Sequence, residues 1–236
     1  MHRIRLASLR WSSLLLAVLV GARAVAAEPP PTPAPAAAVE EFMLGRDYQA
    51  VTPPQPVADS SKIEVLEVFW YGCPHCFDFE PYVAKWLADK PDDVDFKRVP
   101  AAFNKRWQLH ARTYYAAEAL GVLDKIHAPL FKAIHEEKQT LADEESLAGF
   151  FAKQGVSADD FKQTLSSFGV EGKLQQAQTM VRRYGITGVP AMVVNGKYVA
   201  GATAGTFANM LKIVDFLVAK ERGEKKAAVP AAESTE

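Results

Sequence analysis

Residues 63–76 of the chain read IEVLEVFWYGCPHC. The first seven of them are short in extent, rich in β-branched side chains and almost continuously apolar, which predicts a strand covered on both faces. A helical apolar periodicity follows from residue 77 to about 89. Pro74 suits the first turn of that helix, where its missing N–H costs nothing. Cys73 is therefore expected at the turn between a buried strand and a helix.

The remainder of the body has the same two kinds of pattern. Residues 94–99 predict a second strand, so that strand, helix and strand form a βαβ unit with a right-handed crossover. Helices are then predicted at 105–120, 124–137, 143–154, from Ser157 onward, and at 170–184. Two strands at 191–194 and 197–200 are joined by the hairpin signal Asn195-Gly196, and a helix at 206–222 follows. The pattern predicts an α/β body with an α-helical insertion.

The two ends of the chain differ from this body. Residues 1–27 begin with arginines and no acid, continue with an apolar run and end in small residues, which is the plan of a secretory signal peptide. The apolar run is too short for an uncleaved membrane anchor, so we expect cleavage near Ala26 or Ala27 and export. Residues 28–38 are a Pro/Ala-rich tether, and residues 223–236 are expected to be a flexible tail.

Composition excludes several classes of protein. Of 236 residues, 49% are hydrophobic and 23% are charged, which is too apolar for wholesale disorder. No apolar run approaches the roughly 20 residues of a spanning helix, so a multi-pass membrane protein is excluded. A formal net charge of −1 gives no electrostatic reason to expect nucleic-acid binding.

The two cysteines, Cys73 and Cys76, stand two residues apart. A structural crosslink over so short a loop would remove little entropy from the unfolded chain. A zinc site needs about four ligands, and the chain has neither a second cysteine pair nor histidines at a partnered spacing. Two inert buried thiols do not suit the oxidising compartment that an exported protein enters. The pattern favours a redox-active dithiol/disulfide.

Position gives the two sulfurs different roles. At the start of a helix, unpaired N–H groups and the helix dipole favour a thiolate on Cys73. His75 can add a positive charge or a hydrogen bond to the same sulfur, and its alternative is an exposed loop histidine without a role. Cys76, one turn further on, is expected to be the buried partner. Because a stabilised thiolate favours the dithiol form, the pair should be an oxidant.

The sequence resembles the thioredoxin superfamily and, within it, the periplasmic disulfide oxidoreductases of the DsbA type. The resemblance rests on VLE (65–67) before CPHC (73–76), GVPAM (188–192) before VNGKY (194–198), and ALGV (119–122) and PLF (129–131). It covers about residues 60–220 and is loose after Gly201. It implies a thioredoxin fold interrupted by an inserted α-helical domain. We place the two thioredoxin-like parts at 39–103 and 171–222, and the insertion at 104–170.

The resemblance also implies roles for a proline and its neighbour. Pro190 is the family's cis-proline beside the disulfide, and the backbone of Val189 pairs with an extended substrate segment. The alternative is an ordinary proline at the start of a strand. In both cases Pro190 donates no ladder hydrogen bond, which leaves neighbouring backbone free for a guest strand.

Two acids near the motif have alternatives that the sequence leaves open. The resemblance makes Glu67 a buried acid that manages the proton of Cys76, with a raised pKa. The alternative is a strand residue at a wet edge. Glu80 is expected either to interact with Lys97 or Arg98 or to be a solvated surface acid.

The sequence thus predicts a thiol:disulfide oxidoreductase that donates its Cys73–Cys76 disulfide to reduced or unfolded exported proteins through a mixed disulfide at Cys73. No flavin or nicotinamide fingerprint is present, so neither a cofactor beyond this disulfide nor a metal is predicted. The resemblance implies a periplasmic location and reoxidation by a quinone-linked inner-membrane partner of the DsbB type. A monomer is expected.

Two other functions remain as alternatives. A periplasmic reductase or isomerase would share the fold, although an isomerase of this superfamily usually carries a dimerisation domain, for which the segment before residue 62 is too short. A binding module or chaperone for unfolded chains would use the same groove without needing Cys73.

Overall fold

The structure is a computed structural model that describes residues 41–228. Within that range, one five-stranded sheet has the order β1-β5-β4-β2-β3. The strands are β1 (Gln49–Ala50), β2 (Ile63–Phe69), β3 (Val94–Pro100), β4 (Ala191–Val194) and β5 (Tyr198–Ala200). β2 and β3 are parallel, and the pairs β2–β4, β4–β5 and β1–β5 are antiparallel. The expected signal peptide and tether, residues 1–38, lie outside the described residues.

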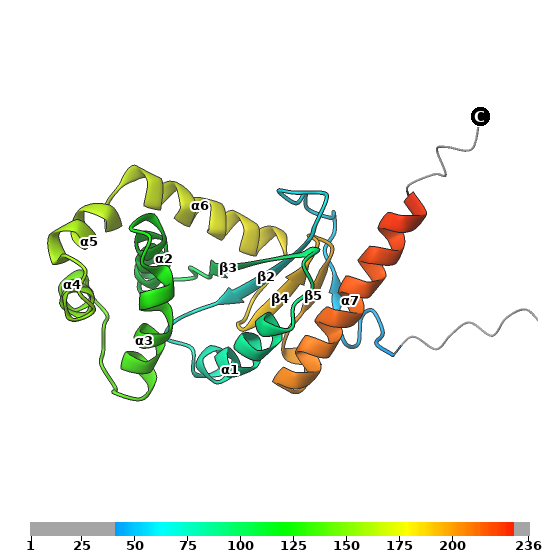
Figure 1. Cartoon of the computed structure of the whole chain (residues 1–236), viewed down its shortest axis with the longest axis horizontal. Helices are drawn as coiled ribbons and strands as arrows, with labels where there is room; N and C mark the ends of the chain where they lie inside the picture. Colours follow the sequence, from blue (N-terminus) through cyan, green and yellow to red (C-terminus); the bar gives the residue numbers. More distant parts are fainter. Residues whose placement is uncertain (1–40, 229–236) are drawn as a thin grey trace, which may run out of the picture. The chain divides into compact units, whose positions relative to one another are not determined.

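Every residue of β2 is buried, which confirms a strand covered on both faces. One face packs on α1 (Pro74–Ala88) and α7 (Phe207–Ala228), as Ile63 and Val65 join the cluster around Phe79. The other face, with Leu66 and Val68, belongs to a second cluster that includes α6 (Phe168–Arg183). Figure 1 shows α6 and the pair α1 and α7 on opposite sides of the sheet.

The helical insertion lies between β3 and β4 in the chain. It contains α2 (Lys105–Ala119), α3 (Leu123–His135), α4 (Glu144–Lys153) and α5 (Ala158–Leu165), and α6 leads back to the sheet. Asn104, Asp143, Ser157 and Ser167 cap four of these helices, each accepting a hydrogen bond from a backbone N–H of the first turn. The helical part stands beside one end of the sheet, and α6 spans the distance between them (Figure 1).

The structure confirms the fold class, an α/β thioredoxin-like fold with a helical insertion, and it differs from the sequence predictions in detail. Strand β1 and the short 3-10 helix at Ala202–Ala204 were not predicted. The boundary placed between residues 170 and 171 falls inside α6, so no loop separates the two segments there. The division into segments remains a prediction.

The prediction of a flexible tail from residue 223 is wrong for its first part. Helix α7 continues to Ala228 because tertiary contacts hold its last turns. The ammonium of Lys225 donates to the carbonyls of Ser60 and Lys62, at 2.8 and 2.6 Å. Glu224 pairs with Lys197 at 2.9 Å. Residues 229–236 lie outside the described part of the chain.

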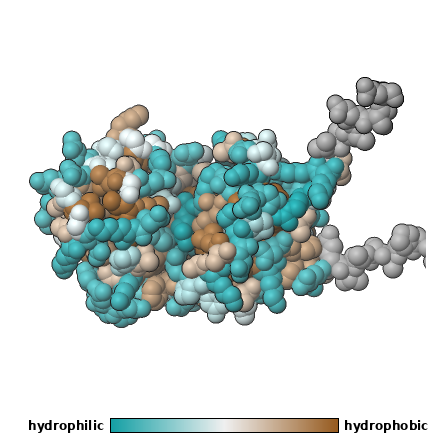
Figure 2. Space-filling model, viewed as in Figure 1, coloured by the Kyte–Doolittle hydropathy of each residue, from teal (hydrophilic) through white to brown (hydrophobic). Residues whose placement is uncertain are grey.

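Figure 2 shows that hydrophilic residues cover most of the visible face, with apolar residues gathered over the helical part and over the sheet. Five large apolar side chains are well exposed among the described residues: Met43, Leu44, Tyr82, Phe103 and Phe168. Along residues 41–228, no helix combines the length and the apolar character needed to cross a membrane.

The Asn195-Gly196 turn provides a test of the hairpin. Gly196 has φ +65°, and a Cβ there would stand 2.2 Å from the carbonyl oxygen of Gln55. We expect Gly196→Ala to lower the free energy of unfolding by about 1–3 kcal/mol. A Cβ added to Gly149, in the interior of α4, would meet no atom of a neighbouring element within 4 Å. Gly149→Ala should instead raise stability by about 0.5–1 kcal/mol. Urea unfolding measures both, and equal effects would contradict this view of the turn.

Candidate active site

Cys73 stands at the junction between β2 and α1, as expected. It is the N-cap residue of α1, with φ −88° and ψ 117°, and Pro74 occupies the first helical turn. Its N–H donates to the carbonyl of Trp70 at 3.0 Å, which fixes the turn after the strand. Cys76, one turn further, is fully buried, and Cys73 is 8% exposed. Both are free thiols in this structure.

The surroundings shift the proton affinities of these sulfurs in opposite directions. The pKa of Cys73 is lowered to about 6, first by a hydrogen bond from the Cys76 thiol and further by the N–H groups of Cys76 and His75 and the charge of His75, while burial opposes the shift. The pKa of Cys76 is raised far above its ordinary value, first by burial and then by its interaction with Cys73. A thiolate and a protonated thiol therefore lie side by side at neutral pH.

The β4 register brings the predicted proline to the cysteines. β4 pairs with β2 with Ala191 opposite Val68, so the loop before β4 lies beside the loop after β2. The Val189–Pro190 peptide bond is cis, as the resemblance implied. The carbonyl oxygen of Val189 is 3.5 Å from the Cys73 sulfur and accepts a hydrogen bond from it when Cys73 is protonated.

A groove of about 370 Å³ opens beside this contact. The residues that line it are His75, residues 185–191, Val199, Gly201, Ala202, residues 205–207 and Met210. The structure thus brings His75 together with Val189 and Pro190. Among the backbone hydrogen bonds of the described residues outside helices and strands, none uses the N–H of Val189. The groove offers apolar walls and free backbone to an extended chain.

Glu67 is buried and not at a wet edge. It is wholly inaccessible, in the middle of β2, with Arg98 opposite it on β3. The Arg98 Nε donates to Glu67 Oε2 at 2.9 Å. Burial raises the pKa of Glu67 to about 8, and the charge of Arg98 opposes the shift. The second oxygen of Glu67 has no hydrogen-bond partner within residues 41–228.

Glu80 takes the paired alternative. Its Oε2 accepts from Arg98 Nη2 at 3.3 Å, and its Oε1 lies 3.2 Å from His127 Nε2. Burial raises the pKa of Glu80, but the hydrogen bond from His127 and the charge of Arg98 outweigh it and keep that pKa below its ordinary value. Lys97 pairs elsewhere, with Glu64 at 2.8 Å.

Sequence reasoning missed two histidines that the helical insertion places beside the motif. His127 Nδ1 lies 2.9 Å from the hydroxyl of Tyr71, and His135 Nε2 lies 2.7 Å from the Tyr71 carbonyl. The ring of His135 also stacks on Phe77, with centroids 5.0 Å apart. The signal for His127 in the sequence is its place among the buried positions of α3, because a histidine among apolar neighbours needs a polar partner. His135 is only partly buried and carries no such signal.

An aromatic stack covers the turn before Cys73. The rings of Trp70 and Trp107 are parallel, with centroids 4.1 Å apart, and Phe103 packs on Trp107 at 4.9 Å. A Cβ on Gly72 would fall 2.3 Å from the Trp70 ring. Position 72 therefore accepts only glycine without moving this stack.

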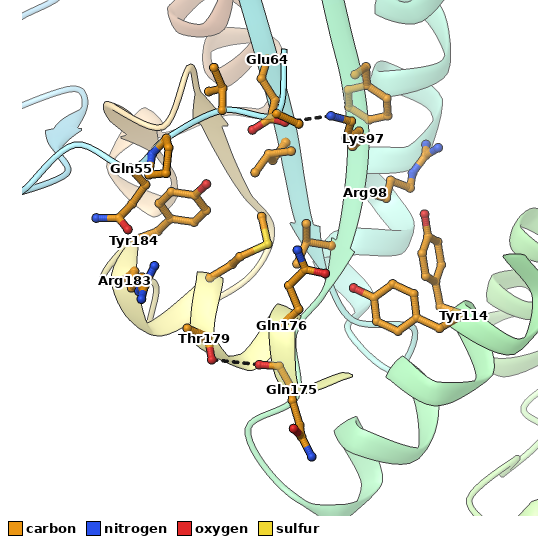
Figure 3. Close-up of a pocket in the computed structure, with 18 of the residues that line it drawn as sticks. Gln55, Glu64, Lys97, Arg98, Tyr114, Gln175, Gln176, Thr179, Arg183 and Tyr184 are labelled. Carbon is orange, nitrogen blue, oxygen red and sulfur yellow. Dashed lines mark hydrogen bonds and ion pairs between the residues drawn. The ribbon is translucent and has the colours of Figure 1, made fainter. Parts of the chain in front are cut away.

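A larger cavity, of about 890 Å³, lies on the face of the sheet that α6 covers. Figure 3 shows it between the sheet and the helix that carries Gln175, Gln176 and Thr179. Lys97 turns toward Glu64 in this view, and Arg98 turns to the opposite side of its strand. None of the residues predicted for the site lines this cavity, apart from the Lys97 and Arg98 considered as partners of Glu80. Of these two cavities, the smaller groove is the one that a residue of the cysteine motif, His75, lines.

Within residues 41–228, no group of three or more His, Cys, Asp or Glu side chains is arranged to hold a metal ion.

Residues 94–210 match the model of the DSBA-like thioredoxin domain. The thiol:disulfide interchange protein DsbA of Pseudomonas syringae is 42% identical over 218 residues, which cover 92% of this chain and 96% of that protein. The thiol:disulfide interchange protein DsbA of Burkholderia cepacia is 40% identical over a region that covers 77% of this chain and 86% of that protein.

Solved structures agree with these relatives. The crystal structure of Pseudomonas aeruginosa DsbA has a TM-score of 0.76 at 41% identity and covers 80% of this chain and 98% of its own. The oxidoreductase NmDsbA1 of Neisseria meningitidis has a TM-score of 0.68 at 26% identity, with 77% and 95% covered.

The shifted pKa of Cys73 can be titrated through the absorbance of the thiolate at 240 nm in the reduced protein. We expect a transition near pH 6 that is lost in Cys73→Ser. In Cys76→Ala the transition should move to higher pH, because the strongest stabilising hydrogen bond is removed. An unchanged transition in Cys76→Ala would show that the backbone N–H groups and His75 suffice.

Proposed function

The chain belongs to the DsbA family of thiol:disulfide interchange proteins, and from this we propose which of its atoms carry out the exchange. It is an enzyme that oxidises protein dithiols. Cys73 is the sulfur that enters the mixed disulfide, and Cys76 is its buried partner. The observation that carries this assignment is the position of Cys73 at the N-cap of α1, 8% exposed, with Cys76 wholly buried one turn further on. These positions lower the pKa of Cys73 and raise that of Cys76.

In the first step, a substrate thiolate attacks the sulfur of Cys73 in the oxidised enzyme. A substrate–Cys73 disulfide forms, and the bond between Cys73 and Cys76 breaks. The electron pair of the broken bond goes to the sulfur of Cys76. Because the pKa of Cys76 is strongly raised, this sulfur must take up a proton as it leaves.

In the second step, another thiolate of the substrate attacks the substrate sulfur of the mixed disulfide. The substrate disulfide forms, and Cys73 leaves as a thiolate that needs no proton, because its pKa is about 6. The substrate has lost two electrons and the enzyme disulfide has gained them. Stabilisation of this leaving thiolate favours the reduced enzyme, which makes the disulfide an oxidant.

Glu67 is proposed as the acid that supplies the proton to Cys76. Its pKa of about 8 leaves it protonated at neutral pH, and when it is ionised its charge raises the pKa of Cys76. A protonated carboxyl that reaches a departing thiolate, directly or through one water, is what general acid catalysis requires. His75 and Pro74 tune the Cys73 side, through the charge of His75 and the start of the helix.

The substrate is a reduced or unfolded polypeptide, bound as an extended segment. We assign its binding to the groove beside Val189 and Pro190, where backbone is free and the Cys73 sulfur is 3.5 Å from the Val189 carbonyl. The wider proposal is that the protein acts on exported proteins in the periplasm, as a monomer, and is reoxidised there by a quinone-linked membrane partner of the DsbB type.

The redox potential tests the direction of this exchange. Equilibration of the mature protein with glutathione buffers, followed by thiol alkylation, should give a potential near the roughly −120 mV of DsbA and not the roughly −270 mV of thioredoxin. Cys73→Ser should lose all oxidase activity toward a reduced test protein. A potential near that of thioredoxin would mean a reductase, and activity in Cys73→Ser would mean a binding protein.

The proposed location can be tested with the full chain expressed in a bacterium. We expect the protein in the periplasmic fraction, with a mature N-terminus at residue 27 or 28 by intact mass, because small residues end the apolar leader. Substitution of Ala26 and Ala27 by a bulky residue should block cleavage, because one of the two immediately precedes each expected site. Full-length protein in the cytoplasmic fraction would contradict the proposal.

A further inference from the structure

A buried chain of polar contacts connects the helical insertion to Glu67. The hydroxyl of Tyr71 lies 2.9 Å from His127 Nδ1, and His127 Nε2 lies 3.2 Å from Glu80 Oε1. Glu80 Oε2 accepts from Arg98 at 3.3 Å, and the same guanidinium donates to Glu67 at 2.9 Å. Glu67 on β2, Glu80 on α1, Arg98 on β3 and His127 on α3 are thus connected. The protonation of Glu67 therefore depends on residues from four elements.

The charges of this chain do not balance without an additional proton. Two carboxylates, Glu67 and Glu80, share the single guanidinium of Arg98. Two ionised acids in one buried site repel each other, so one of them retains a proton more firmly than an isolated acid does. Which acid retains it depends on the hydrogen bonds that each carboxylate receives.

Those hydrogen bonds are unequal. Glu80 receives one from Arg98 on one oxygen and one from His127 on the other, and its side chain is 18% exposed. Glu67 receives one, from Arg98, and is wholly buried. Hydrogen bonds to the charged form lower a carboxyl pKa, and burial raises it. Both differences leave Glu80 ionised and put the proton on Glu67.

The hydroxyl of Tyr71 selects the form of His127 that this requires. Burial lowers the pKa of His127, so its ring is neutral and has one N–H and one acceptor nitrogen. When Tyr71 donates its O–H to Nδ1, the N–H must be on Nε2, where it points at Glu80. Tyr71 stays protonated, because burial raises its pKa.

We propose that His127 is a positioning residue of the thiol exchange, which holds Glu80 ionised and thereby keeps the shared proton on Glu67. The inference rests on the proposed role of Glu67 as proton donor. In each cycle Glu67 gives its proton to the departing Cys76 sulfur. Glu67 regains this proton when the Cys76 thiol loses it as the disulfide reforms.

Other ionisable groups face this chain and contribute to the apparent titration. They are Cys76 on α1, Tyr114 and Glu118 on α2, and Asp124 and His135 on α3. None of them replaces the hydrogen bond that His127 makes to Glu80, so removal of that bond has a distinct effect.

The test measures how fast glutathione opens the enzyme disulfide as a function of pH, with each rate divided by the fraction of glutathione present as thiolate. Cys76 must be protonated as it leaves in this reaction. The corrected rate of the wild-type protein should therefore be level at neutral pH and fall with an inflection near pH 8, where Glu67 ionises. Glu67→Gln should abolish the inflection.

His127→Phe removes the donor among neighbours that are largely aromatic, Phe69 and Phe131 among them. Glu80 then competes for the proton, Arg98 pairs more fully with Glu67, and the inflection should move down by about one to three pH units. His127→Gln restores an N–H for Glu80 and an oxygen for Tyr71, so its inflection should stay at the wild-type pH. Tyr71→Phe removes the hydrogen bond that keeps the N–H of His127 on Nε2. Its inflection should therefore lie between those of the wild-type protein and His127→Phe.

His110 supplies the matched control. It is a second buried histidine of the insertion, but its Nε2 lies 2.9 Å from the Leu141 carbonyl and contacts no carboxylate. His110→Gln should leave the inflection unchanged. If His127→Phe, folded by its thermal transition, keeps the wild-type inflection, the inference is wrong. A wild-type protein that fails to oxidise a reduced test protein would instead overturn the proposed function.

Discussion

The pairing of the Cys73 sulfur at the start of α1 with the buried thiol of Cys76, which lowers the pKa of Cys73, is the interaction around which this molecule is organised. It needs one sulfur at a helix N-terminus and another a turn deeper, in a place that water does not reach. A strand buried on both faces provides this arrangement, because its end emerges directly from the core into the first turn of α1. The cis-proline loop reaches the same place through the pairing of β4 with β2. Strand β2 thus positions both the cysteines, which follow it in the chain, and the cis-proline loop, which precedes its neighbour β4.

The buried charged groups near the cysteines are electrostatically unfavourable. Two carboxylates and a guanidinium lie in or near the core, where the loss of hydration is expensive unless every charge is well partnered. One Glu67 oxygen has no such partner among the described residues, so this part of the molecule favours the neutral carboxylic acid. The helical insertion completes the site from the other side, with Tyr114, His127 and Phe131 packed around the ring of Phe69. It is therefore part of the chemical environment, and not only a cover over it.

Local patterns in the sequence predicted the features that depend on neighbouring residues alone. Strand β2, the start of α1 and the unequal burial of the two cysteines follow from periodicity and from Pro74, and the structure confirms them. The cis bond before Pro190 came only with the family resemblance, since an isolated X–Pro bond is seldom cis. The contact between His127 and Glu80 joins residues 47 positions apart, and no spacing rule covers it. Likewise β1 is two residues long, and the last turns of α7 depend on remote backbone carbonyls.

Helix α6 starts in the helical part and ends beside the sheet without a break. Its Val170 and Val181, near opposite ends, belong to one continuous hydrophobic cluster that also holds Leu66 of the central strand and Phe151 of the insertion. Because α6 is unbroken, there is no hinge where the chain passes from the helical part to the sheet. Neither part can lose its packing against α6 without exposing apolar surface of the other. The two parts should therefore melt as one cooperative unit, with the slowest amide hydrogen exchange distributed over both.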